Sequence, residues 1–229
     1  MESGKLNGVV RALLEPEKRA VRRLIKRRRE RLRTGARDAA LVGLGIFAIF
    51  SMIASIASRS VPPFIPLAAW FAICAGLVVW AVVSSRRDLM KEIDRLEATL
   101  KRNEAHEVTV RSTEMIEFEE EEDEGACYAF QLKDDRIVFI VGQEYYPSAK
   151  FPNTDFSLVS IQDGDGRCIE ELIYKRGHKL KPCRMIPAKF KSEMLLPDHL
   201  EVIRGKLPEL ESLLTVAYQN RGLRTAIHA

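Results

Sequence analysis

The chain has few of the residues from which metal and redox sites are built, with four cysteines and four histidines among its 229 residues. The cysteines are Cys74, Cys127, Cys168 and Cys183, and no two of them form a C-x-x-C pair. The histidines form neither an H-x-x-H nor an H-E-x-x-H pattern, so zinc and thioredoxin-type motifs are not indicated. A G-x-S-x-G elbow and a phosphate-binding glycine loop are also missing. We therefore predict no catalytic, cofactor or metal site.

Charge is absent from two long stretches, residues 39–58 and residues 60–85. A helix of twenty residues is about 30 Å long, which is the thickness of the hydrocarbon core of a bilayer. Between the stretches, Pro62 and Pro63 cannot continue a helix. We therefore predict a two-helix transmembrane hairpin over residues 38–85, with spans at about 39–58 and 64–84. Neither span contains an ionisable residue, which disfavours a transporter or a channel.

The charges elsewhere are unevenly distributed. Residues 1–37 contain 13 Lys or Arg against 4 Asp or Glu, whereas residues 106–229 contain 16 against 22. Basic residues flank the outer ends of both apolar stretches, and the linker between them carries only Arg59. By the positive-inside rule, this predicts a multi-pass protein of the plasma (inner) membrane with both termini cytoplasmic.

Residues 1–37 form a basic segment, and apolar residues close to helical spacing predict an amphipathic helix over residues 11–37. The cations of this segment are predicted to contact the anionic headgroups of the lipid bilayer. Specific recognition of one headgroup is an alternative. The segment has no interleaved aromatic residues for base stacking, so we expect no nucleic-acid partner. The predicted contact residues are Arg22, Arg23, Lys26, Arg27, Arg28 and Arg29.

Two further patterns indicate helix association. Ala68, Ala72 and Gly76 recur at four-residue spacing, which allows two helices to approach closely, within one hairpin or in a homodimer. Residues 86–105 are predicted to form a helical stalk, in which four apolar residues form either a short coiled-coil seam or a side that packs on the chain's own soluble domain. They are Leu89, Ile93, Leu96 and Leu100.

Residues 106–229 are predicted to form a cytoplasmic β-rich domain, a small barrel or curled antiparallel sheet with a C-terminal helix at 207–218. Strands are expected at residues 107–118, 126–133, 136–142, 155–162, 168–175, 179–186 and 200–204, and a short helix at 188–195. The Asp163–Gly166 sequence indicates a hairpin turn, because its register does not fit an EF-hand. The fold class expected for the whole chain is thus an α+β membrane protein.

The acidic run at residues 117–124 holds seven carboxylates in eight positions. It is typical of a solvated loop, and two sharper hypotheses are a contact with the basic N-terminal segment and weak binding of divalent cations. The function expected from the sequence is a membrane-anchored binding or scaffolding module with an unidentified protein partner. The alternatives are a tethered enzyme, whose site in residues 106–229 has the 145–155 loop as one wall, and a structural membrane oligomer.

Overall fold

The computed structural model describes residues 3–57, 64–121, 123–191, 194 and 196–216. Most side chains between residues 36 and 72, and those of Cys74 and Val78, lie outside this description. The chain divides into two compact units. Unit 1 comprises Met1–Arg11, Ala105–Ser160 and Glu171–Ala229, and unit 2 comprises Ala12–Glu104 and Ile161–Glu170.

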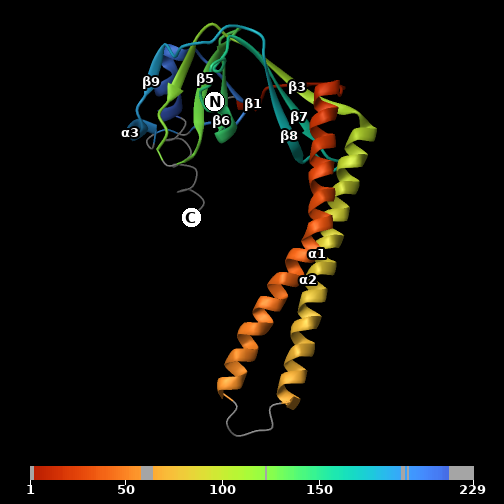
Figure 1. The fold of residues 1–229 in the computed structure, drawn as a ribbon. Coiled ribbons are helices and arrows are strands. Elements are labelled where there is room, and N and C mark those ends of the chain that lie inside the picture. The colour runs from red at the N-terminus through yellow and green to blue at the C-terminus, as the bar shows by residue number, and fades with distance from the viewer. Residues whose placement is uncertain (1–2, 58–63, 122, 192–193, 195, 217–229) are drawn as a thin grey trace, which may run out of the picture. The chain divides into compact units, whose positions relative to one another are not determined.

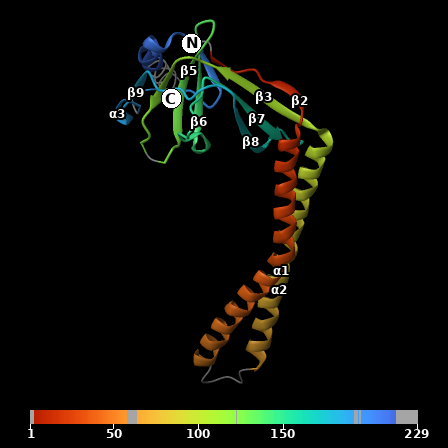
Figure 2. The ribbon, with the colours of Figure 1, turned by 45° about the horizontal axis from the view of Figure 1, so that its top comes forward.

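Unit 1 is built on a six-stranded sheet with the order β1-β10-β6-β5-β4-β9. Its strands are β1 (Ser3–Lys5), β4 (Met115–Phe118), β5 (Ala126–Leu132), β6 (Arg136–Gly142), β9 (Arg184–Ile186) and β10 (Glu201–Arg204). Figure 2 labels the strands β5, β6 and β9 of this sheet. The β5–β6 hairpin turns at Asp134 and Asp135, whose φ angles of 67° and 51° are ones that aspartate tolerates in tight turns. Strand β6 is central and its residues 137–140 are fully buried, as its apolar sequence predicts.

A four-stranded sheet has the order β2-β3-β7-β8. Its strands are β2 (Val9–Ala12), β3 (Glu104–Arg111), β7 (Asp155–Gln162) and β8 (Cys168–Lys175). Strands β3 and β7 pair antiparallel, with Val108 opposite Leu158 and Val110 opposite Phe156. These apolar pairs place one face of the sheet in a core.

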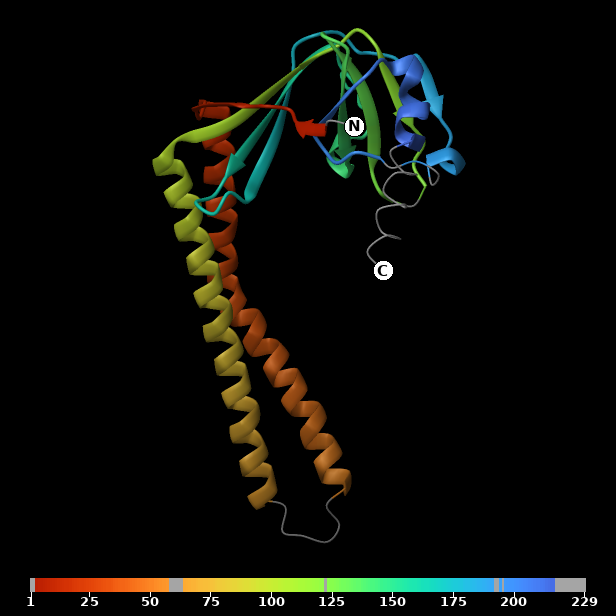
Figure 3. The ribbon, with the colours of Figure 1, turned by 180° about the vertical axis from the view of Figure 1, so that it is seen from behind.

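The six-stranded sheet buries apolar residues on both faces. On one face, Tyr128 and Phe130 pack in a cluster with Phe151 and Phe156, and the rings of Phe130 and Phe156 are 5.2 Å apart. On the other, Phe139 and Ile203 pack against residues of the C-terminal segment, which are Leu207, Leu210 and Leu214. This segment comprises the 3-10 turn η2 (Leu207–Glu209) and helical residues 210–216 (Figure 3). Burial on both faces makes this sheet the structural centre of unit 1.

The structure corrects several details of the sequence prediction. The expected strand at 107–118 is two strands, β3 and β4, separated at Ser112, whose hydroxyl donates to the Glu114 carbonyl at 2.6 Å. Within 179–186 only β9 is a strand, and it pairs in parallel with β4. The strands of the described residues thus form two sheets, one of them mixed, rather than one small barrel or curled antiparallel sheet. The short helix is α3 (Ala188–Lys191).

Unit 2 contains the long helices α1 (Glu15–Ala57) and α2 (Phe64–Arg102), which run antiparallel beside one another (Figure 1). Helix α1 begins with a capping interaction, in which the Glu17 carboxylate accepts from the Leu14 N–H at 2.7 Å. Pro16 lies in the first turn, where its missing N–H costs nothing. Val21 and Ile25 of α1, and Ile93 and Leu96 of α2, are all at most 7% exposed. The apolar seam predicted in α2 therefore packs on α1 of the same chain.

The predicted transmembrane hairpin is not supported. No helix in the part of the chain that the structure describes is both long and apolar enough to cross a bilayer. Each apolar stretch belongs to a helix that also contains strongly charged turns. Helix α1 begins at Glu15, and helix α2 ends at Arg102. On this finding the α+β membrane-protein class is wrong, as is the multi-pass plasma-membrane location with cytoplasmic termini. What remains, among the described residues, is an α+β fold with two sheets and two long helices.

The linker at 58–63 and the side chains of Ala68 and Ala72 lie outside the described residues. Gly76 is exposed, and a Cβ placed on it meets no atom within 4 Å. The association stripe predicted on α2 therefore stays a prediction.

Leu96→Ala is expected to lower the free energy of unfolding by about 2 kcal/mol, because the side chain of Leu96 is only 5% exposed. Urea denaturation followed by tryptophan fluorescence measures this, since both tryptophans, Trp70 and Trp80, belong to α2. Met90→Ala on the same helix is the control, because Met90 is 49% exposed and its loss should change the free energy by less than about 0.5 kcal/mol. Equal unfolding midpoints for the two variants would contradict this packing.

Candidate functional site

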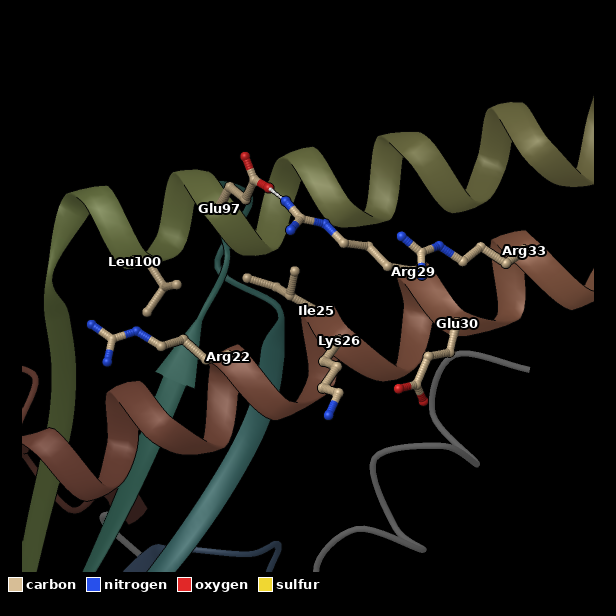
Figure 4. A pocket seen from close by; sticks show the side chains of 8 residues that line it. All are labelled: Arg22, Ile25, Lys26, Arg29, Glu30, Arg33, Glu97 and Leu100. Atoms are coloured by element: carbon tan, nitrogen blue, oxygen red, sulfur yellow. Dashed lines mark hydrogen bonds and ion pairs between the residues drawn. The ribbon is translucent and has the colours of Figure 1, made fainter.

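A groove of about 430 Å³ runs along the helix pair of unit 2 (Figure 4). Four cations from α1 line it, at sequence spacings of four, three and four residues, which place them on one side of the helix. They are Arg22, Lys26, Arg29 and Arg33. Ile25 and Leu100 supply apolar surface, and Glu30 and Glu97 supply the two carboxylates among the lining residues. The groove is therefore both cationic and partly apolar.

The carboxylates neutralise only part of this charge. Glu97 of α2 accepts a hydrogen bond from the Arg29 guanidinium at 2.5 Å, and the figure shows this ion pair reaching across the groove. Arg22 has its nearest carboxylate at Glu15, at 3.8 Å. Lys26 and Arg33 have no ion-pair partner among the described residues. Because the side chain of Arg22 is 60% exposed, its long ion pair is screened by water and weak. An anion entering the groove thus meets cations that are only partly compensated.

The structure divides the six predicted contact residues among different faces of α1. Arg22, Lys26 and Arg29 line the groove. Arg28 turns elsewhere, forms an ion pair with Glu92 at 2.8 Å, and lines a separate cavity of about 270 Å³ that Arg95 and Arg167 also line. The remaining two, Arg23 and Arg27, are exposed and are not among the groove residues.

Arg33 lines the groove although it is not among the six contact residues predicted from the sequence. Its spacing of four residues from Arg29 is the signal that identifies it once one face of the helix is known. Glu97 and Leu100, from the facing helix, had no such signal.

A second polar cluster lies in unit 1. The Tyr145 hydroxyl, in the 3-10 turn η1 (Gln143–Tyr145), donates a hydrogen bond to the Glu171 carboxylate of β8. His199 Nδ1 accepts from the Val141 N–H at 3.3 Å, so the hydrogen of the neutral ring is on Nε2, which is 3.2 Å from the Tyr145 hydroxyl oxygen. The two rings are stacked with centroids 5.0 Å apart. A hydrogen-bond chain therefore runs from His199 through Tyr145 to Glu171.

Burial shifts both ends of this chain towards their neutral forms. It raises the pKa of Glu171 from the ordinary value of 4.5 to about 7, and the nearby Glu144 carboxylate adds to the effect. Burial also lowers the pKa of His199, against an opposing effect of Glu144. Tyr145 is 1% exposed. Because each polar group of the chain is bonded to another member or to the backbone, we interpret it as a buried structural network rather than as a catalytic site.

The acidic run is used largely within unit 1. Glu120 accepts hydrogen bonds from the Gly125 N–H at 2.9 Å and from the Tyr146 hydroxyl at 2.6 Å. Glu119 accepts from the Ala188 N–H at the start of α3, and Glu124 pairs with Lys191, which is 7% exposed. No group of three metal-ligating side chains occurs among the described residues. These carboxylates thus organise the loop around α3, and the proposed contact with the basic segment stays a prediction.

The described cysteines differ in exposure, with Cys127 buried and Cys168 and Cys183 exposed. No known protein family, curated protein or solved structure matches this chain.

Proposed function

We propose that the chain is a binding module for phosphate-bearing anions, and that the groove between α1 and α2 is its site. One observation carries this proposal: four cations line one groove of about 430 Å³, and only two carboxylates oppose them. Guanidinium groups suit phosphate oxygens because their N–H donors form paired hydrogen bonds. Three of the four cations are arginines.

The spacing of the cations sets the size of the ligand. Arg22 and Arg33 are eleven residues apart, which corresponds to about 16 Å along a helix. One phosphate group spans only a fraction of this length. The groove therefore suits several phosphates, or a phosphate with a further group that lies along the helices.

Binding, rather than catalysis, is the role that these side chains favour. Arginine stays protonated at neutral pH and cannot serve as a general acid or base. The carboxylate of Glu97, the groove's acidic group on α2, is held in its ion pair with Arg29. Scaffolding through this groove is a consequence of binding when the phosphate belongs to a larger assembly.

The test reverses charge in the groove. The triple variant Arg22→Glu/Lys26→Glu/Arg33→Glu is expected to weaken binding of inorganic tripolyphosphate by more than about tenfold in isothermal titration calorimetry, because Coulomb repulsion replaces attraction. Arg29 is left in place so that its ion pair with Glu97 still joins the helices. Binding of the wild type should also weaken as salt is added.

The matched control is Arg19→Glu/Arg23→Glu/Arg27→Glu, which changes the net charge equally on residues outside the groove. It should retain at least half of the wild-type affinity. Equal losses in the two triple variants would show that only net charge matters and would overturn the proposed site. Circular dichroism checks that both variants keep their helices.

Three phosphate-bearing probes distinguish whether the bound phosphate belongs to a free anion, a lipid headgroup or a nucleic acid. They are tripolyphosphate, phosphatidylcholine vesicles with and without phosphatidylglycerol, and a duplex oligonucleotide. Binding to the first two that depends on Arg22, Lys26 and Arg33 supports the proposal, and their ratio separates a free anion from a headgroup. Preference for the duplex over both would overturn the assignment of the groove to a free anion or a headgroup in favour of nucleic-acid binding.

A further inference from the structure

We call the proposed binding site between α1 and α2 the phosphate groove. Two neighbouring grooves on the helix pair extend it. The first neighbour, of about 420 Å³, shares Arg29, Arg33 and Glu97 with it. The second neighbour, of about 580 Å³, shares Leu32, Met90 and Asp94 with the first. Because adjacent grooves share lining residues, the three form one surface along α1 and α2, which we call the helix belt.

The helix belt also has apolar surface at the end away from Arg22. Its last groove is lined by Leu32, Val83 and Met90. The side chains of Val83 and Met90 are 41% and 49% exposed, although the helix pair buries other apolar residues nearby. Exposed apolar surface of this kind, beside a polar rim, is typical of a binding site.

Cations border this apolar end as well. Arg86, Arg87 and Lys91 of α2 line the last groove with Asp94 as the carboxylate. Over the whole belt, seven Lys or Arg side chains face three carboxylates, those of Glu30, Asp94 and Glu97. The belt therefore offers apolar contact and an excess of positive charge to the same ligand.

We infer that the ligand is an anionic amphiphile, a phosphate headgroup that carries an acyl chain. This inference rests on the proposed function and specifies its ligand class. The phosphate binds among Arg22, Lys26 and Arg33, and the acyl chain lies along the belt over Leu32, Val83 and Met90. Both ends of the belt are cationic, so a second copy of this chain would bring like charges together. Charge complementarity thus selects an anionic occupant over self-association.

The test compares two ligands with related headgroups, glycerol 3-phosphate and dihexanoyl phosphatidic acid below its critical micelle concentration. Calorimetry on the full chain is expected to show the acylated ligand bound at least about tenfold more tightly, because burying each methylene is favourable. The double variant Val83→Gln/Met90→Gln should lose most of this difference while binding glycerol 3-phosphate as the wild type does. Glutamine keeps the helix propensity of the positions high.

Met185→Gln/Phe190→Gln is the matched control, because it removes two other exposed apolar side chains, from unit 1. It should leave both affinities unchanged. Equal affinity of the wild type for the two ligands would overturn the amphiphile while leaving the phosphate site intact. Failure of the proposed function would give a different result, because the charge-reversal triple variant would then change the affinity for neither ligand.

Analytical ultracentrifugation without ligand adds a further check. A dimer of the wild type that Val83→Gln/Met90→Gln converts to a monomer would assign the belt to self-association and overturn the inference. A monomer in both cases supports a small anionic occupant.

Discussion

Gly125→Ala is expected to lower the free energy of unfolding by about 3 kcal/mol or more. Gly125 has a φ angle of +89°, which side chains with a Cβ rarely adopt. A Cβ at this position would lie 2.5 Å from the Gly142 carbonyl carbon and 2.5 Å from the Gln143 nitrogen. Both contacts are with backbone at the end of the β5–β6 hairpin, so a rotamer change cannot relieve them.

Gly166→Ala is the matched control for this prediction. Gly166 also has a positive φ, of +77°, but a Cβ there meets no atom within 4 Å. Its substitution carries the conformational cost alone, about 1 kcal/mol. Urea denaturation followed by far-ultraviolet circular dichroism compares the variants. Similar losses in both would show that the overlap with Gly142 is not a real constraint.

The sequence predicts the strands that carry local signals. Strands β6, β7 and β8 have the predicted bounds, because β6 is a continuous apolar run and the β7–β8 hairpin is closed by the Asp163–Gly166 turn. The Asp163 carboxylate accepts from the Asp165 and Arg167 N–H groups, each at 2.9 Å, as expected for aspartate at a turn.

Strands without local signals were not predicted. Residues 3–5 contain no β-branched or aromatic side chain, yet they form β1 by pairing with β10, in which Lys5 lies opposite Glu201. The parallel pairing of β9 with β4 brings together Arg184 and Ile116, which are far apart in the sequence. Such pairings depend on tertiary context rather than on local propensity.

The sequence indicates a chemistry for the candidate site, but it does not indicate the geometry. The density of arginine in residues 22–33 indicates an anion-binding segment, but only the position of α2 shows that Arg22, Lys26 and Arg29 share a groove. Hydrophobicity alone predicted two membrane spans, which the described helices do not support, because the apolar stretches belong to helices with strongly charged turns. In the hydrogen-bond chain, Tyr145 is 26 positions from Glu171 and 54 positions from His199. No sequence spacing indicates that these residues lie together.

Glu171→Gln is expected to remove a stability change of up to about 3 kcal/mol between pH 5 and pH 8. The pKa of Glu171 is raised to about 7 by burial and then by Glu144, so the folded state binds the proton more tightly than the unfolded state. This contribution to stability is present below the unfolded pKa of 4.5 and is lost as the pH rises through about 7. Glutamine does not ionise, and its side-chain oxygen still accepts from the Tyr145 hydroxyl. The variant should therefore be more stable than the wild type at pH 8.

The other charged groups near the His199–Tyr145–Glu171 hydrogen-bond chain also affect the expected pH dependence of stability. The pKa of His199 is lowered, chiefly by burial, so its contribution has the opposite sign: stability falls as the pH drops below the ordinary histidine value of 6.5. Lys5 acts on His199 in the same direction as burial, and Glu144 opposes it. In Glu171→Gln the histidine contribution acts alone, so stability should rise from pH 5 to pH 6.5 and then level off. Urea denaturation at each pH, followed by tyrosine fluorescence, measures these curves, because all five tyrosines belong to unit 1.

Glu144→Gln separates the electrostatic cause from the effect of burial. It leaves Glu171 able to ionise but removes the carboxylate that raises its pKa, so the loss of stability should move to a lower pH with a similar shape. If the wild type and Glu171→Gln instead had parallel stability curves across this range, Glu171 would not be the titrating group. The buried chain in unit 1 would then have to be stabilised by hydrogen bonds whose strength does not depend on its ionisation.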